Sequence, residues 1–531
     1  MISAGVILSV LVGLVIFLFG LENFSSEIKK IAGEQFSKLL QKAVSNRFVA
    51  TLSGFLVTAI LQSSAATTLI AVSLINAGII SFGQSLGIIF GSNIGSTITA
   101  QLVALKLTSF APYFVITGFL LGVFGGKFKY IGKGLFYFGL VFFGLSLMSQ
   151  AVTPIKDDPA VINYFLNLSN IYLAILAGFL LTALTNSSAV VIGIVIVFAG
   201  AGLIPLSHGI PILLGANLGT TMTTLIASFR LNLYAKRTAV AHLLFNIFGV
   251  LLILPFLNLY TNFIISLGGS VEQQIANAHT IFNIINAGIF LILLNPFKKV
   301  VELIVRGKEE EILLKPKYIT EKLSESNATC FKTAEKEISY SMGISFKMFQ
   351  LSKELLREQT PRKIDMLERL GLLTNKLNGS INDYLFKLSE RKLTHKEAKK
   401  ILYLIRMSNA LEQLGDIAEE FGELPEKMRE KRVYFAPNSI KGIDEVYKKF
   451  EEAFEELKKA FPDKDPIHAK RITERNSIEP LINRKYNENI PLLREEFQYS
   501  GSIFAETISL IENSISKIRE VIILSQLYYK N

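Results

Sequence analysis

The first 307 residues of the chain carry apolar runs long enough to cross a membrane, whereas the remainder is dense in charged residues. A membrane-spanning helix needs about 20 mostly apolar residues, and residues 3–21 form such a run without a charge. No basic segment precedes this run, and acidic and basic residues follow it directly, so we predict a retained membrane helix and not a cleaved signal. We expect a transmembrane domain over residues 1–307 and a soluble domain over residues 308–531.

The transmembrane region contains a duplicated segment. Residues 52–104 and 176–228 align at a constant offset of 124 without a gap, with 19 identities in 53 positions. Shared apolar composition does not account for aligned polar pairs such as Asn93 with Asn217. Self-similarity at a fixed spacing is the signature of repeated structure, so we predict two repeat cores with the same fold.

The basic residues of the loops indicate how the two repeats are oriented, because lysine and arginine are enriched in cytoplasmic loops. One assignment places 14 basic residues inside and 2 outside, with Asp157 and Asp158 in an external loop. The repeats then enter the membrane from opposite faces, which predicts inverted topology. We expect a multi-pass protein of the inner (plasma) membrane with its C-terminal domain in the cytoplasm.

One segment of each repeat must turn back within the membrane if the loop charges are to stay on their predicted sides. Polar residues interrupt the stretch 50–79 midway, and each flank is about 20–24 Å of helix, too short to span the hydrocarbon core. We predict re-entrant hairpins with tips at Gln62–Ser64 and Asn186–Ser188. Each is followed by a helix that we expect to be interrupted, at Gly91–Thr97 or Gly215–Thr221. Broken helices in matching halves of an inverted repeat point to a transport site.

The predicted site has no fixed charge. Asp, Glu, Lys and Arg are absent from Val49 to Leu105 and from Tyr172 to Phe229. Helix N-termini can hold an anion through backbone N–H groups, and hydroxyls with unwound carbonyls suit a hard cation such as sodium. Because no cationic side chain would neutralise an anionic solute, a bound cation must do so, which favours symport. The lack of membrane carboxylates argues against proton coupling.

These motifs resemble those of the type II sodium–phosphate cotransporters. Each QSS-type tip is followed by G-x-N-x-G-[ST]-T, and AHLLFN at His242 and AHTIFN at His279 agree with the same family. The bacterial branch of that family often carries a C-terminal PhoU-like helical domain. The resemblance implies sodium-coupled import of inorganic phosphate by alternating access, with both solutes bound at the two Ser-rich tips and the two broken helices of a translocation domain.

The resemblance also implies which residues bind each solute. The implied phosphate-binding residues are Gln62, Ser63, Ser64, Asn186, Ser187, Ser188, Thr97 and Thr221. The implied sodium-binding residues are Gln62, Asn93, Ser96, Thr97, Asn217, Thr220 and Thr221. This sequence departs from the family's Gln-Ser-Ser-Ser tip, because Ala65 and Ala189 replace the last serine and Asn186 replaces the second glutamine.

The region from residue 308 onward has the pattern of a soluble helical bundle. Long stretches lack proline, and breaks fall near Pro425, Pro437 and residues 462–466. The segment RMSNALEQLGDIAEE resembles the E-x-x-x-D signature of PhoU domains, which implies that Glu412 and Asp416 hold a divalent metal; solvated surface charges are the alternative. We expect a regulatory or assembly role, through a partner or a homo-oligomer.

Composition and motifs exclude other classes of function. The net charge of +11 arises mainly in membrane loops and does not indicate a nucleic-acid surface. We expect no enzyme, because no nucleophile–base pair, metal triad or P-loop is present. The sequence thus predicts an all-α polytopic membrane protein that binds phosphate and sodium within the lipid bilayer. A transporter of another oxyanion and a membrane-bound phosphate sensor remain as alternatives.

Overall fold

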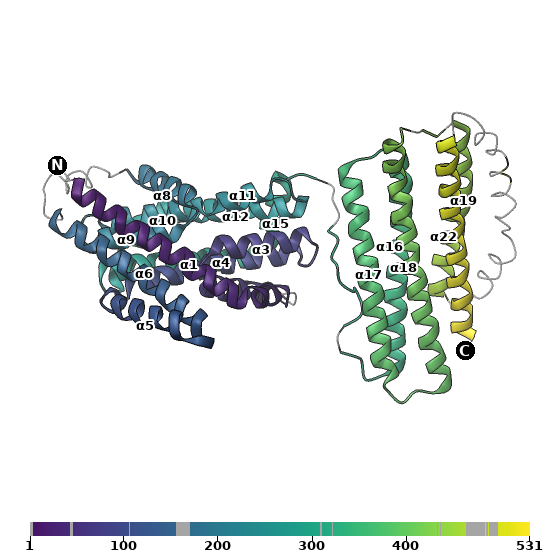
Figure 1. The fold of residues 1–531 in the computed structure, drawn as a ribbon, viewed down its shortest axis with the longest axis horizontal. Helices are drawn as coiled ribbons and strands as arrows, with labels where there is room; N and C mark the ends of the chain where they lie inside the picture. The colour runs from purple at the N-terminus through teal and green to yellow at the C-terminus, as the bar shows by residue number, and fades with distance from the viewer. Residues whose placement is uncertain are drawn as a thin grey trace. The chain divides into compact units, whose positions relative to one another are not determined.

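In the computed structural model the chain forms two compact units, Met1–Glu311 and Ile312–Asn531. The structure describes residues 4–42, 46–105, 107–155, 170–307, 311–320, 322–432, 434–435, 437–463, 484, 487 and 498–530. All regular secondary structure among these residues is helical, which confirms the all-α prediction (Figure 1). The predicted external loop with Asp157 and Asp158 lies outside the described residues.

The first unit is a bundle of apolar helices. Its α-helices are α1 Ala4–Lys42, α2 Arg47–Leu61, α3 Ser64–Asn76, α4 Phe82–Ala104, α5 Ala111–Phe124, α6 Lys129–Val152, α8 Ile171–Thr185, α9 Ser188–Gly200, α10 Leu206–Gly219, α11 Thr221–Ser228, α12 Leu233–Ile253, α13 Leu257–Ser266, α14 Val271–Ile292 and α15 Leu294–Ile304. Short 3₁₀ turns lie at Leu107–Phe110, Gly126–Phe128, Thr153–Ile155 and Leu254–Phe256.

Length and apolar composition separate these helices into two groups. Within the described residues, seven candidate spans are long and apolar enough to cross a membrane, beginning with Ala4–Lys30. Four further apolar helices are shorter, and they are α2, α3, α8 and α9. At 13 to 15 residues each, these four are about 20–22 Å long, below the thickness of the hydrocarbon core.

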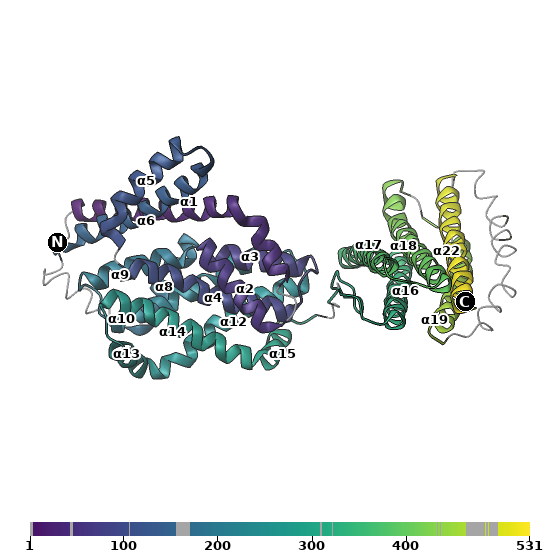
Figure 2. The ribbon, with the colours of Figure 1, turned by 90° about the horizontal axis from the view of Figure 1, so that it is seen from below.

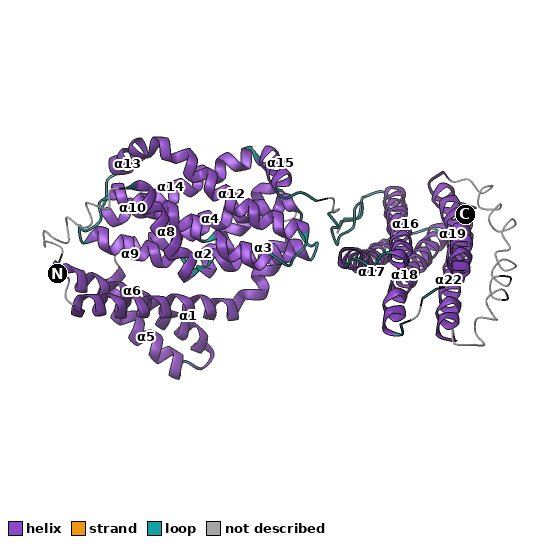
Figure 3. Ribbon diagram, turned by 90° about the horizontal axis from the view of Figure 1, so that it is seen from above, coloured by secondary structure: helices purple, strands orange, loops and turns teal. Residues whose placement is uncertain are grey.

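The two segments predicted to be repeats contain matching helix pairs. The side chain of Asn46 accepts hydrogen bonds from the first backbone N–H groups of α2, and Asn170 does the same for α8. In both copies the short helix then packs on the long helix that follows, α2 on α4 and α8 on α10. Helices α1, α5 and α6 pack together on one side of this unit (Figures 2 and 3).

Glycine permits the close approach within each pair. A Cβ atom on Gly91 of α4 would lie 1.8 Å from the carbonyl oxygen of Thr51, and one on Gly215 of α10 would lie 1.9 Å from that of Ile175. No side chain fits at such distances, so the backbones are in direct contact. The aligned glycines are therefore packing positions.

The prediction of a helix break at Gly91–Thr97 is wrong, because α4 runs without interruption from Phe82 to Ala104. Its polar side chains bond to carbonyls of the preceding turn and so leave the helix intact: Asn93 donates to Ile89 at 2.9 Å, and Thr97 donates to Ile94 at 2.7 Å. The second break is present but short, since α10 ends at Gly219 and α11 begins at Thr221.

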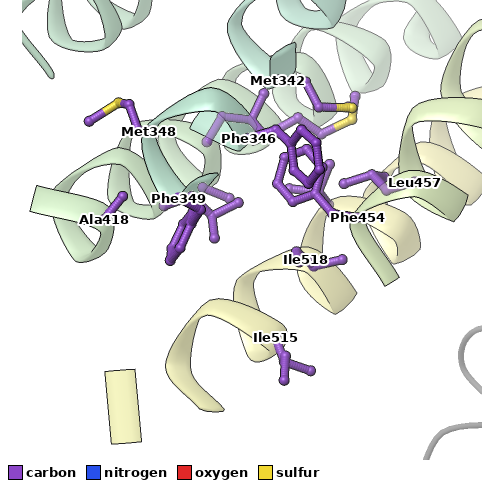
Figure 4. Close-up of a cluster of buried hydrophobic side chains, with 14 of the residues drawn as sticks. Met342, Phe346, Met348, Phe349, Ala418, Phe454, Leu457, Ile515 and Ile518 are labelled. Carbon is purple, nitrogen blue, oxygen red and sulfur yellow. The ribbon is translucent and has the colours of Figure 1, made fainter. Parts of the chain in front are cut away.

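The second unit is a bundle of long amphipathic helices. They are α16 Asn327–Arg357, α17 Pro361–Ser389, α18 His395–Glu430, α19 Pro437–Asp463 and α22 Gln498–Lys530. Figure 4 shows part of its core, where Phe346 of α16 stacks on Phe454 of α19 with ring centroids 4.8 Å apart, and Ile515 and Ile518 of α22 lie close by. Burial of this apolar face stabilises the bundle.

Candidate functional site

The tips of the two predicted hairpins have the same backbone conformation. Gln62 follows the end of α2 with φ 53°, and Asn186 follows the end of α8 with φ 52°, both in the left-handed region. Ser63 and Ser187 come next with extended backbone and occupy the N-cap positions of α3 and α9. Each tip thus reverses the chain and presents a helix N-terminus with orphan backbone N–H groups.

These two tips meet at one small cavity of about 40 Å³. It has room for about three waters, so an ion held there must shed its hydration shell and take its interactions from the protein. The cavity brings together most of the predicted site, and its lining residues are Gln62, Ser63, Ser64, Ala65, Ser96, Thr99, Asn186, Ser187, Ser188, Ala189 and Thr220.

The serine hydroxyls at the tips are suited to bind an anion. The oxygen of Ser63 accepts from the backbone N–H of Ala66 at 3.2 Å, which leaves its proton available for donation. Ser187 has no side-chain capping bond, so its hydroxyl remains able to donate as well. Together with the positive ends of α3 and α9, these donors form an electrostatically favourable site for an oxyanion.

Two further hydroxyls, Ser96 of α4 and Thr220 between α10 and α11, are suited to bind a cation. Ser96 donates to the carbonyl oxygen of Asn93, and Thr220 donates to that of Asn217, both at 2.7 Å. A hydroxyl whose proton is used in this way presents only lone pairs to the cavity. Oxygen lone pairs are the ligands that hard cations such as sodium prefer.

Four predicted residues do not line this cavity. Thr97 and Asn93 bond within α4, and Thr221, the first residue of α11, donates to the carbonyl oxygen of Leu218 in α10 at 2.7 Å. Asn217 is buried among polar neighbours: its Oδ1 lies 2.9 Å from Nε2 of His279, and its amide donates to Asn283 at 3.4 Å. The hydrogen bonds of these four residues therefore go to partners outside the cavity lining.

Two threonines that bond to the tip side chains were missed by the sequence analysis, and one of them, Thr99, lines the cavity. Thr99 donates to the amide oxygen of Gln62 at 2.7 Å, and Thr223 donates to that of Asn186 at 2.9 Å. The two threonines are aligned at the repeat offset of 124 and identical in both copies. This identity at aligned positions could have identified both threonines. They were missed because each threonine lies two residues beyond the G-x-N-x-G-[ST]-T motif.

In the second unit, Glu412 and Asp416 lie on α18 as expected, one turn apart. Burial, then the charge of Asp416, raises the pKa of Glu412; burial raises the pKa of Asp416. Burial and the charge of Asp416 also raise the pKa of Glu419. Among the described residues no group of three or more His, Cys, Asp or Glu is placed to hold a metal. The metal at this pair therefore stays a prediction.

Fold and cavity together define an all-helical, multi-pass membrane protein with a neutral, polar site between two matching helix tips. The chain belongs to the Na⁺/Pi-cotransporter family, which matches residues 16–150 and 163–270. It is therefore a phosphate transporter and not an enzyme.

Several named proteins are similar to this chain. The Bacillus subtilis "Uncharacterized protein YqeW" is 34% identical over 297 residues, which are 55% of this chain and 96% of that protein. The Escherichia coli K12 "Putative inorganic phosphate export protein YjbB" is 25% identical over 486 residues, 91% of this chain and 89% of that protein. The human "Sodium-dependent phosphate transport protein 2C" is 42% identical over 85 residues, 15% of this chain and 14% of that protein. No solved structure matches the chain.

Proposed function

We propose that this protein is a sodium-coupled phosphate symporter that works by alternating access, with two inverted repeats and re-entrant hairpins α2–α3 and α8–α9. The observation that carries the proposal is the single cavity where Ser63 and Ser187 meet with Ser96 and Thr220. The tip serines bind phosphate, and the helix hydroxyls bind sodium. The recurrence of caps, glycine contacts and tip conformations at an offset of 124 supports the two-repeat arrangement.

Sodium is required because the site is neutral. Phosphate carries one to two negative charges near neutral pH, and burying an uncompensated charge costs far more than a few neutral hydrogen bonds return. No Lys or Arg lies within either repeat core, 52–104 or 176–228. Bound sodium therefore supplies the positive charge, which couples the two solutes.

We propose import as the direction, because an inward sodium gradient drives a symporter inward. Export is the second candidate, since a relative that covers 91% of this chain is named a phosphate export protein. Radiolabelled phosphate movement in proteoliposomes separates the two when the sodium gradient is imposed in each direction. Movement that ignores sodium in both directions would contradict symport.

We further propose that the C-terminal unit is a cytoplasmic, PhoU-like regulatory domain. The five long helices among its described residues and the Glu412–Asp416 pair support this assignment. Impermeant cysteine labelling tests the placement: a cysteine at Lys399, exposed on α18, should react only from the cytoplasmic side. Labelling of Lys399→Cys by the impermeant reagent in intact cells would contradict the proposed topology.

A further inference from the structure

The soluble unit contains a second, larger cavity, outside anything the transport site uses. Its volume is about 700 Å³, which falls in the range of about 300–1,000 Å³ typical of small-molecule sites. Lys332, Lys336, Ser339 and Tyr340 of α16 form one wall. Tyr318, from the segment before α16, and Tyr529, near the end of α22, also line it.

The cavity carries an excess of positive charge. Lys332 and Lys336 lie one turn apart on α16, and within the described part of the chain neither forms an ion pair. Elsewhere in this unit, lysines such as Lys363 and Lys427 are paired with glutamates at 3.3 Å or less. The Nζ of Lys336 lies 5.9 Å from the ring centroid of Tyr318. Lysines without an ion-pair partner that line a cavity favour an anionic ligand.

Two carboxylates lie near these lysines, but only Glu335 lines the cavity, so its wall carries two lysines against one glutamate. Glu335 accepts a hydrogen bond from the phenol of Tyr528 at 2.5 Å. Glu337 is fully buried and accepts from three successive backbone N–H groups, those of Lys317, Tyr318 and Ile319, at 2.8, 2.5 and 2.9 Å. Glu337 thereby fixes the segment that carries Tyr318 against α16.

The remaining walls are aromatic. The Nζ of Lys317 lies 5.4 Å from the ring centroid of Tyr318 and 5.3 Å from that of Tyr340, so it forms a cation–π contact with each. Burial raises the pKa of Tyr529 and keeps its phenol neutral. Aromatic rings stack on nucleobases irrespective of base identity, whereas lysines bind phosphate groups.

We propose that this cavity binds a nucleotide, with its phosphates on Lys332 and Lys336 and its base among the tyrosines. A single inorganic phosphate would fill only a small part of about 700 Å³ and would leave the aromatic walls unused. The ligand would contact Tyr318, which lies close to the start of the second unit at Ile312. Binding itself does not depend on the proposed transport mechanism.

The test is nucleotide binding to the purified full-length protein, measured by calorimetry with ATP, AMP, a cyclic dinucleotide, adenosine and tripolyphosphate. At least one of the three nucleotides should bind once per chain, and adenosine and tripolyphosphate each about tenfold more weakly, since each lacks one half of the ligand. Lys332→Glu with Lys336→Glu should weaken nucleotide binding by about tenfold or more. The matched control is Lys396→Glu with Lys399→Glu on α18, which should leave binding unchanged.

Three results would overturn the proposal. The first is the absence of saturable binding by any of the three nucleotides. The second is tripolyphosphate binding as tightly as the nucleotide, which would make the cavity a general anion site. The third is equal weakening by the α18 control pair. If the double glutamate variant does not fold, Lys332→Ala and Tyr340→Leu replace it, with circular dichroism as the check of folding, and both should weaken binding.

Discussion

Gln62 and Asn186 share the left-handed backbone conformation, with φ of 53° and 52°, although they are different residues 124 positions apart. Each amide oxygen accepts a hydrogen bond from a threonine, Thr99 of α4 for Gln62 and Thr223 of α11 for Asn186. The conformation turns the chain so that the next serine begins a new helix. The two tips therefore have the same local structure.

A β-branched residue at the tip should be poorly tolerated. Gln62→Val places a branched side chain in the left-handed region and should destabilise the protein by about 1–2 kcal/mol relative to Gln62→Gly. Glycine adopts this conformation without strain, but it lacks the amide that Thr99 holds. We expect Gln62→Gly to keep the melting temperature near that of the wild type while phosphate uptake falls. Equal melting temperatures for both variants would contradict the assigned backbone.

The threonines that hold the tips should differ in their effect on transport. Thr99 lines the cavity, whereas Thr223 lies outside its lining. Thr99→Val and Thr223→Val each remove one hydrogen bond, worth about 0.5–1.5 kcal/mol. We expect Thr99→Val to reduce phosphate affinity more strongly than Thr223→Val. Uptake kinetics in proteoliposomes measure this difference. A larger loss of phosphate affinity in Thr223→Val than in Thr99→Val would contradict the assignment of Thr99 to the site.

Gly91 tests the direct contact between α2 and α4. Gly91→Ala would place a methyl group 1.8 Å from the carbonyl oxygen of Thr51, so the helices must separate. We expect a loss of folded protein or a sharp fall in melting temperature, as overpacking typically costs about 1–3 kcal/mol or more. Gly134→Ala is the control, because nothing lies within 4 Å of its Cβ position. Fluorescence size-exclusion and thermal unfolding give the comparison.

The sequence was sufficient to predict the tips because their signal is local. Polar residues in an apolar run, repeated at a fixed offset, indicate Gln62–Ser64 and Asn186–Ser188 without knowledge of packing. The continuity of α4 could not be predicted in this way. Glycine and polar residues at Gly91–Thr97 are compatible with a break or with tight helix packing, and the neighbouring Thr51 carbonyl decides in favour of packing. Thr99 was missed for the same reason, since its role depends on a partner 37 residues away.

Asp416 should destabilise the soluble unit at neutral pH. Its pKa is raised from an ordinary 3.8 by burial, and its charge raises the pKa of Glu412 and Glu419. A raised folded-state pKa means that the free energy of unfolding falls as pH rises from the ordinary value through the raised one. Asp416→Asn should therefore increase the melting temperature at pH 7, and the increase should shrink at about pH 4.

A bound divalent metal would reverse the sign of that effect. If Glu412 and Asp416 hold Mn²⁺ or Mg²⁺, the added metal should raise the melting temperature of the wild type more than that of the Asp416→Asn variant. Thermal unfolding of the full-length protein with metal and with EDTA gives both comparisons. An identical metal response in the two proteins would assign the pair to surface charge alone.

Phosphate affinity should depend steeply on sodium, because the cavity supplies no positive side chain of its own. Replacing sodium with potassium removes the charge that compensates the buried anion, and phosphate should by linkage tighten sodium binding by the same factor that sodium tightens phosphate binding. Calorimetric titration of each solute at several concentrations of the other measures both factors. Tight phosphate binding that is unchanged in sodium-free buffer would refute the symport proposal.

Variants of the two tip serines should differ in stability but not in their effect on phosphate binding. Ser63→Ala and Ser187→Ala should each weaken phosphate binding by about 1–3 kcal/mol, since each leaves a buried anion short of one donor. Only Ser63 caps its helix, through the backbone N–H of Ala66, so Ser63→Ala should also cost about 1 kcal/mol of stability. Ser187→Ala should leave the melting temperature unchanged, because Ser187 makes no capping bond. Ala65→Ser, which restores the third serine of the family's tip, should be tolerated. If Ser187→Ala binds phosphate as tightly as the wild type, the second tip does not contact the anion.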